Sequence, residues 1–108
     1  KCIQQILTIT IIDLVRHQYM NNQICTANEF CKKTHRFKVS AFGSTYSLKQ
    51  KNVIINNDSC VQIYNLKNNL TLNDSWCTIL LFDKITKKYL VDVGNNKHVK
   101  ISVENIIF

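Results

Sequence analysis

The sequence predicts an α+β domain in which helices come first and an antiparallel β-meander of three to five strands follows. An apolar stripe with helical spacing opens the chain, and a helix start signature comes soon after it. From Cys60 onward, apolar and polar residues alternate in short runs separated by turns that contain Asn or Gly. Helices followed by strands are the usual order of an α+β fold.

The first predicted helix covers residues 3–20. Its apolar stripe follows helical spacing and comprises Ile3, Leu7, Ile11, Leu14 and Val15. The β-branched Ile and Thr residues at positions 8–12 favour a strand. However, a run of eighteen residues without a turn signal is long for a strand. We therefore expect a helix that ends at Asn21-Asn22.

A second, shorter helix is predicted to begin near Thr26. Thr26 and Glu29 have the spacing of a capping box, in which each side chain bonds the backbone N–H of the other residue. The densest basic cluster then falls in the later turns, where positive charge stabilises the end of the helix dipole; its members are Lys32, Lys33, His35 and Arg36. This position explains the cluster without a ligand.

The strands are predicted in the second half of the chain. The runs CVQIYNL, CTILLFD and KKYLVDV lead to a last strand in HVKISVENIIF. Lys84-Ile85-Thr86 is the expected turn of a hairpin, and Gly94-Asn95-Asn96 marks the next turn. Asn tolerates the left-handed conformation, so it takes turn positions in a chain with two Gly and no Pro. No internal repeat is visible, and we expect one domain over residues 1–108.

The composition is that of a folded, basic protein. The hydrophobic share of 45% excludes a disordered chain, and the formal net charge is +7. The positive residues are scattered without a block of five or six like charges, which fits a solvated surface. An anionic partner is the alternative. For nucleic acid, stacking side chains would lie beside charge, because Phe37, Phe42 and Tyr46 interleave with Arg36, Lys38 and Lys49.

Five cysteines are many for a chain of 108 residues, and disulfides in an exported protein are the simplest explanation. We expect one bridge between Cys25 and Cys31 and another between Cys60 and Cys77, with Cys2 left over. The alternative is a zinc site in which Cys25, Cys31 and His35 are joined by Cys60 or Cys77. This spacing matches no common zinc module, so we expect no metal.

The sequence lacks the signatures of common enzymes. It has no G-x-S-x-G, no H-E-x-x-H and no glycine loop that would cradle a phosphate. His17, His35 and His98 are possible acid–base groups in principle, but nothing beside them indicates catalysis. We therefore predict a non-enzymatic protein without a cofactor.

The order of parts resembles the soluble domain of a type IV pilin-like or pseudopilin minor subunit. In that family, a membrane-embedded helical half precedes a globular domain with an antiparallel sheet. The segment IIDLVRHQYMNNQICTANEF resembles the helix exit of the family, where a helix runs through an aromatic residue into a polar, Asn-rich turn. The chain begins at Lys1 without Met, so we expect that an upstream signal or membrane helix has been removed.

The resemblance implies an exported assembly domain, periplasmic, at the cell surface or secreted, that packs onto homologous subunits. A minor pilin with a basic face would also contact DNA, and the candidate anion- or DNA-binding residues are Lys84, Lys87, Lys88, Lys97 and Lys100. One alternative is a secreted effector or ligand-binding domain that acts on a host protein. Another is a small basic regulator that binds nucleic acid.

Overall fold

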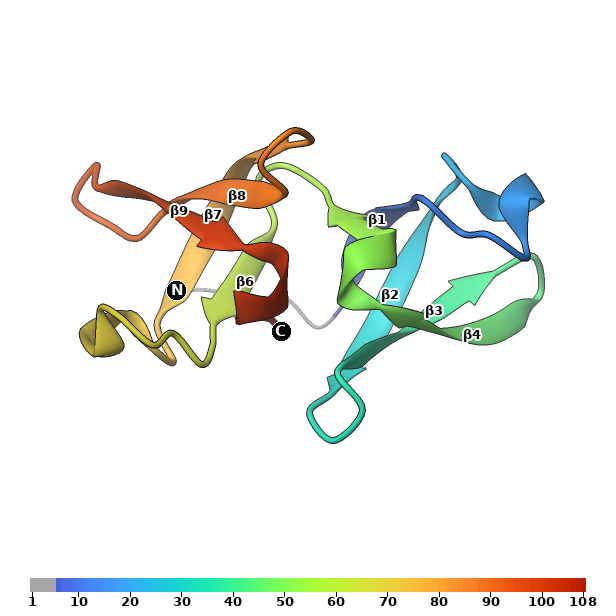
Figure 1. Cartoon of the computed structure of the whole chain (residues 1–108), viewed down its shortest axis with the longest axis horizontal. Helices are drawn as coiled ribbons and strands as arrows, with labels where there is room; N and C mark the ends of the chain where they lie inside the picture. The colour runs from blue at the N-terminus through green and yellow to red at the C-terminus, as the bar shows by residue number, and fades with distance from the viewer. Residues whose placement is uncertain (1–5) are drawn as a thin grey trace. The chain divides into compact units, whose positions relative to one another are not determined.

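The computed structural model describes residues 6–108, and its regular structure consists of β-strands and short 3₁₀ turns (Figure 1). The chain divides after Asn56 into two compact units. Among the described residues, we call residues 6–56 unit 1 and residues 57–108 unit 2. Each unit contains one five-stranded antiparallel sheet.

Unit 1 is a four-stranded meander whose fifth strand returns to pair with the first. Its sheet order is β4-β3-β2-β1-β5. In chain order the elements are β1 (Leu7–Ile11), η1 (Gln18–Met20), β2 (Ile24–Cys31), β3 (Arg36–Ala41), β4 (Ser44–Lys49), η2 (Gln50–Asn52) and β5 (Val53–Ile55).

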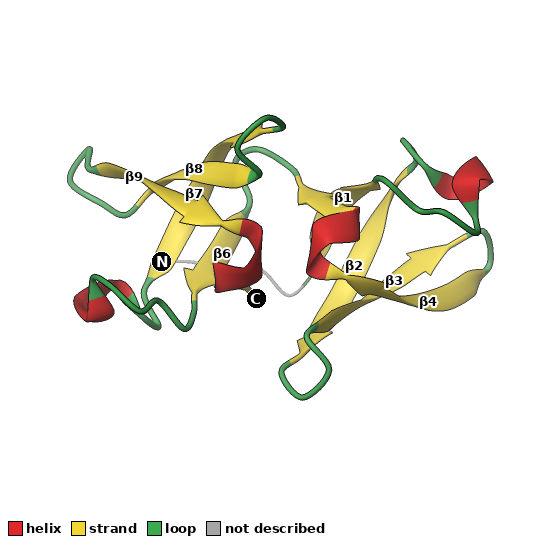
Figure 2. Ribbon diagram, viewed as in Figure 1, coloured by secondary structure: helices red, strands yellow, loops and turns green. Residues whose placement is uncertain are grey.

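Unit 2 repeats this plan with the order β10-β6-β7-β8-β9. Its elements are β6 (Cys60–Ile63), η3 (Leu70–Leu72), β7 (Trp76–Asp83), β8 (Lys88–Asp92), β9 (His98–Ser102), η4 (Val103–Asn105) and β10 (Ile106–Ile107). In both units a 3₁₀ turn lies in the loop after the first strand and another precedes the last strand (Figure 2).

In each unit, the side-chain amide of an Asn at the equivalent position holds the first loop. The Asn21 side chain accepts a hydrogen bond from the Leu14 N–H (2.8 Å) and donates one to the Leu14 carbonyl (3.0 Å). Asn73 makes the same pair of bonds with Leu66, at 2.7 and 3.2 Å. Because the amide replaces two backbone partners at once, it closes a loop that lacks ladder bonds of its own.

A second amide ties the end of each unit to the start of the same loop. Asn52 Nδ2 donates to the Ile12 carbonyl (3.0 Å), and Asn105 Nδ2 donates to the Tyr64 carbonyl (2.9 Å). The second strand of each sheet also carries an irregularity at matching places, after Ala27 and after Ile79. Within residues 6–108, the two units therefore share one order of elements and the same two amide contacts, a structural likeness that is not visible in the sequence. The single domain over residues 1–108 stays a prediction.

The predicted α+β class is wrong, because residues 6–108 contain strands where two helices are expected. Leu7, Ile9 and Ile11 are fully buried and alternate with polar neighbours, which is the period of a strand. The β-branched residues at positions 8–12 correctly favoured a strand. The length of the run wrongly favoured a helix, because the short strand β1 is followed by a long irregular loop. Val15 is 81% exposed, so it belongs to no apolar stripe. Residues 3–5 of the predicted helix lie outside the described part.

The second predicted helix is also absent, and its residues form β2 and the following turn. Thr26 pairs with Ser40, and Glu29 lies opposite Lys38 in the neighbouring strand. Ladder pairing on both sides of β2 overrides the local capping signal. His35 takes a left-handed conformation (φ 58°) at the end of the β2–β3 turn, which no helix interior would allow.

The hairpin predictions of the second half are confirmed. Strands β7 and β8 pair antiparallel on either side of the turn that contains Lys84-Ile85-Thr86, and β8 pairs with β9 across the Gly94-Asn95-Asn96 turn. Asn22, Asn65, Asn69, Asn95 and Asn96 have positive φ, as expected if Asn replaces Gly in turns.

The described residues contain no helix with the length and hydropathy that a membrane span needs.

Replacing Asn21 by Ala removes both bonds to Leu14, and we expect it to lower the free energy of unfolding by about 1–3 kcal/mol. Asn73→Ala should have a similar cost in unit 2, because the two amides are equivalent. Urea denaturation measures both. The control is Asn28→Ala, which removes one exposed bond to Ser40 Oγ (2.9 Å) and should cost less than about 0.5 kcal/mol. Equal losses for Asn21→Ala and Asn28→Ala would contradict the role of the amide.

Candidate functional site

Positive charge is concentrated in unit 1. Residues 6–56 carry seven Lys or Arg and two acidic residues, a formal +5, whereas unit 2 carries six Lys and five acidic residues, a formal +1. The cations of unit 1 are Arg16, Lys32, Lys33, Arg36, Lys38, Lys49 and Lys51. The net charge of the whole chain therefore hides a strong asymmetry between two units of the same fold.

A hollow of about 340 Å³ lies between the β1–β2 loop and the end of β4. Its basic lining residues come from the loop, β3, β4 and η2, and are Arg16, His17, Arg36, Lys49 and Lys51. Asp13 is the one acidic residue among the described residues that line it. The volume is at the lower end of the range for ligand pockets, and the surrounding charge favours an anion.

Two of these cations lie directly opposite each other. Arg36 of β3 and Lys49 of β4 are register partners, so their side chains leave the same face of the sheet. The Arg36 side chain is further fixed by a hydrogen bond that Nη1 donates to the Ser47 carbonyl (3.0 Å). Like charges at directly opposite positions destabilise a sheet. The pair therefore opposes folding stability, which makes it a candidate for function.

The loop that forms the other wall of the hollow is anchored at both ends. Asn52, only 7% exposed, accepts at its carbonyl from the Ile12 N–H (3.0 Å) and donates through Nδ2 to the Ile12 carbonyl. The Asn21 amide holds Leu14, as described above. Arg16 and His17 therefore project from a short span of backbone that is fixed on either side.

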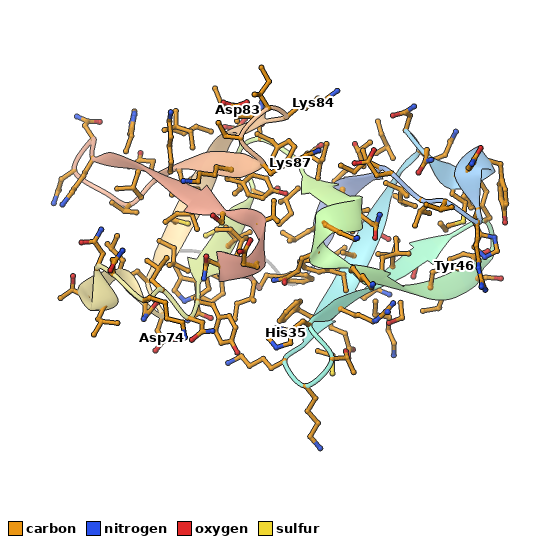
Figure 3. The ribbon with its side chains drawn as sticks, viewed as in Figure 1. His35, Tyr46, Asp74, Asp83, Lys84 and Lys87 are labelled. Carbon is orange, nitrogen blue, oxygen red and sulfur yellow. The ribbon has the colours of Figure 1, made fainter. Side chains whose placement is uncertain are left out.

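Aromatic side chains continue the site toward the β3–β4 hairpin. The His17 ring lies 5.9 Å from the Tyr19 ring and 6.5 Å from the Tyr46 ring, measured between centroids. Tyr19 in turn meets Phe42 edge to face at 5.9 Å. Partial desolvation, followed by the neighbouring Tyr46 hydroxyl, raises the pKa of Tyr19. Figure 3 shows Tyr46 at the end of unit 1 near η1.

The sequence identifies this site in part. Phe42, Tyr46, Arg36 and Lys49 lie in or beside it, as the interleaved pattern of aromatic and basic residues suggests. Phe37, in contrast, is 2% exposed and belongs to the core, where it packs on Phe30 across the β2–β3 ladder. Lys51 was given no role from the sequence, and Arg16, His17 and Tyr19 were not recognised as site residues because they were placed on a helix over residues 3–20. Their signal was that the strict alternation of LTITI ends after Ile11.

Unit 2 lacks this chemistry at the equivalent positions. Asn69 and Thr71 take the places of His17 and Tyr19 in the first loop. In the last hairpin, Val99 and Ser102 replace Tyr46 and Lys49, so Lys88 lies opposite a neutral residue. The aromatic and basic residues of unit 1 are thus not requirements of the fold.

The structure does not gather the five lysines that the sequence proposes for DNA binding. Lys84, Lys87 and Lys88 lie at one end of β8, whereas Lys97 follows its other end. Lys100 lies between these ends, opposite Leu90. An acidic residue, Asp83, immediately precedes Lys84. Hydrogen bonds from the backbone N–H groups of Ile85 and Thr86, and more weakly the charge of Lys100, lower the pKa of Asp83. Figure 3 shows Asp83 beside the lysines of this turn. DNA binding by these lysines stays a prediction.

Neither predicted disulfide pair is brought together. Cys25, Cys31 and Cys77 are free thiols, and Cys25 and Cys31 lie near opposite ends of one extended strand. Cys60 lies opposite Thr78, while Cys77 lies opposite Val61. This offset of one residue places the two sulfur atoms on opposite faces of the sheet.

The zinc alternative finds no support in the described residues. Between positions 6 and 108, no three His, Cys, Asp or Glu side chains are grouped so that they could hold a metal ion. Cys31 instead is the last residue of β2, at the start of the β2–β3 turn. Hydrogen bonds from the Thr34 side chain and from the backbone of Thr34 and Lys33 lower the pKa of its thiol. Asp83 accepts the equivalent bonds in unit 2, which indicates a structural role.

Comparison with known proteins finds no family model that matches the chain and no curated protein that matches it significantly.

The three free thiols should differ strongly in reactivity. Exposed Cys31, with its lowered thiol pKa, should react first with iodoacetamide at pH 8, because the thiolate is the nucleophile. Burial raises the pKa of Cys77 to about 12, so Cys77 should react only after denaturation. Timed alkylation followed by peptide mass spectrometry measures the order. Similar rates for Cys31 and Cys77, or a peptide that links Cys60 to Cys77, would contradict the structure.

Proposed function

We propose that the chain is a non-enzymatic module that binds nucleic acid, and that unit 1 carries the binding site. The observation that supports this most strongly is the facing pair of Arg36 and Lys49 above a hollow lined by three further basic residues. The exposed aromatic residues adjoin this hollow through His17. A basic surface beside exposed aromatic side chains is typical of proteins that bind single strands.

An anionic ligand would relieve the repulsion that the fold tolerates here. Without a ligand, Arg36 and Lys49 are held on one face by the register of two strands. A phosphate between them would form charge-assisted hydrogen bonds to both, and Arg36 is already oriented by its bond to the Ser47 carbonyl. Release of counterions from the phosphates adds to the binding free energy.

The length of the site suits a strand more than a single small anion. Lys49 and Tyr46 lie on opposite faces of β4, and His17, which lines the hollow and contacts the Tyr46 ring, joins the basic and aromatic groups beside this strand. Six residues of extended chain span about 20 Å at ~3.4 Å per residue. A polymer whose monomers each carry a negative charge and a flat ring would contact the basic and the aromatic residues at the same time.

This proposal develops the nucleic-acid alternative of the sequence analysis. The likeness to a pilin subunit was based on a helix packed on a sheet, and residues 6–108 contain no such helix. Membership of that family, export and binding of a protein partner stay predictions on which the proposal does not rest.

Replacing Lys49 by Glu should weaken binding while leaving the fold intact or slightly more stable. A glutamate at position 49 would face Arg36 as an opposite charge, a change worth about 0.2–1 kcal/mol in favour of folding. We expect the dissociation constant for labelled oligothymidylate to rise about tenfold at low salt, equivalent to about 1.4 kcal/mol. The slope of log K against log salt should fall by about one. Fluorescence anisotropy over a salt series measures both quantities.

The matched control is Lys88→Glu, which makes the same charge change at the position in unit 2 equivalent to Arg36. It should leave affinity and salt slope nearly unchanged. If Lys88→Glu weakens binding and Lys49→Glu does not, the lysines of unit 2 form the binding site and our proposal is wrong. If the wild-type protein binds no oligonucleotide at low salt, the proposal of nucleic-acid binding is wrong.

A further inference from the structure

We propose that the aromatic cluster of Tyr19, Phe42 and Tyr46 stacks against unpaired bases, so that unit 1 selects single strands over duplexes. This inference rests on the proposed function, because the phosphates of the same strand would occupy the basic hollow. It goes further in assigning the base-contacting residues and the class of nucleic acid.

The hairpin turn between β3 and β4 contains a residue that the turn does not favour. Ala41 and Ser44 are paired, so Phe42 and Gly43 form a two-residue turn in which both have positive φ, 53° and 74°. Such turns favour Asn followed by Gly, and a bulky side chain in the left-handed region is an unusual, strained choice. Phe42 is also 56% exposed, so burial does not compensate.

Tyr19, whose ring contacts Phe42, is exposed, and the comparison of the two units shows that their shared fold does not require an aromatic residue at this position. It is 64% exposed at the centre of η1, and its ring contacts Phe42 at 5.9 Å between centroids. The equivalent residue of η3 in unit 2 is Thr71, although the Asn amide and the 3₁₀ turn are the same. Tyr46 likewise corresponds to Val99. The fold forms without these rings, so their presence in unit 1 indicates binding.

The charge of the surrounding residues indicates which class of ligand the aromatic rings bind. Aromatic clusters also bind organic cations, but unit 1 has seven Lys or Arg and two acidic residues. His17 lies between the cluster and the hollow, since it lines the hollow and contacts Tyr19 and Tyr46. A nucleobase offers a flat face to the rings while its phosphate reaches the cations. A duplex would hide that face within its base stack.

The test compares three probes that differ in available bases: oligothymidylate, an abasic strand with the same number of phosphates, and a blunt duplex. The wild-type protein should bind oligothymidylate more tightly than either of the other two, by about 5- to 150-fold for one or more stacked bases. In the variants Phe42→Asn and Tyr19→Ala, the ratio of the affinity for oligothymidylate to that for the abasic strand should approach one, while the affinity for the abasic strand stays constant. Anisotropy at one fixed salt concentration measures all three.

Phe42→Asn also separates a binding role from a structural one. Asn suits the left-handed position, so the melting temperature should rise by a few degrees while base-dependent binding falls. Ile85→Asn is the control, because it removes an exposed apolar side chain (93% exposed) from a turn of unit 2. It should change neither the preference nor the affinity.

The outcomes distinguish this inference from the proposed function. Lys49→Glu should weaken binding of the abasic strand and of oligothymidylate by the same factor, because it acts on phosphates. If the wild-type protein binds the abasic strand and oligothymidylate equally, base stacking is wrong while phosphate binding stands. If Phe42→Asn lowers the melting temperature and leaves the preference intact, the aromatic cluster is structural. If no probe binds, both proposals fail.

Discussion

The Asn21 amide is the contact on which the candidate site depends. The loop between β1 and β2 has no ladder partner of its own, and one side chain satisfies both backbone groups of Leu14. With the loop held in this way, Arg16 and His17 line the hollow beside β4, and the Tyr19 ring contacts the Phe42 ring. Because Asn73 forms the same bonds in unit 2, the amide belongs to the shared fold, and function depends on the residues that the loop carries.

The repeat separates what the fold needs from what a function needs. Equivalent positions keep the features that stabilise the sheet: the Asn amides, the strand irregularity and a cross-strand aromatic pair, Phe30 with Phe37 and Phe82 with Tyr89. They differ in surface charge and in exposed rings. Unit 2 thus serves as an internal reference within one chain, against which the facing cations and the strained Phe42 of unit 1 are an excess over structural need.

Local pattern predicted the second half of the chain better than the first. Short turns between alternating runs made β7, β8 and β9 recognisable, since each signal lies within a few residues. In the first half, a short strand followed by a long loop imitated one amphipathic helix, and ladder pairing on both sides of β2 overrode the Thr26–Glu29 capping signal. The site was predicted where its residues share a hairpin, as Phe42 and Tyr46 do. It was missed where hydrogen bonds between distant residues, such as Asn52 and Ile12, bring the loop to β4.

The central claim is that two units of one fold have different surfaces and that only the first binds nucleic acid. Two-dimensional ¹H–¹⁵N spectra recorded during titration with oligothymidylate test it most directly, because each backbone N–H reports its own surroundings. We expect shifts at Arg16–Tyr19, at the β3–β4 hairpin and near Lys49–Lys51, and little change beyond Asn57. Shifts centred on Lys84–Lys88 or spread evenly over both units would contradict this account.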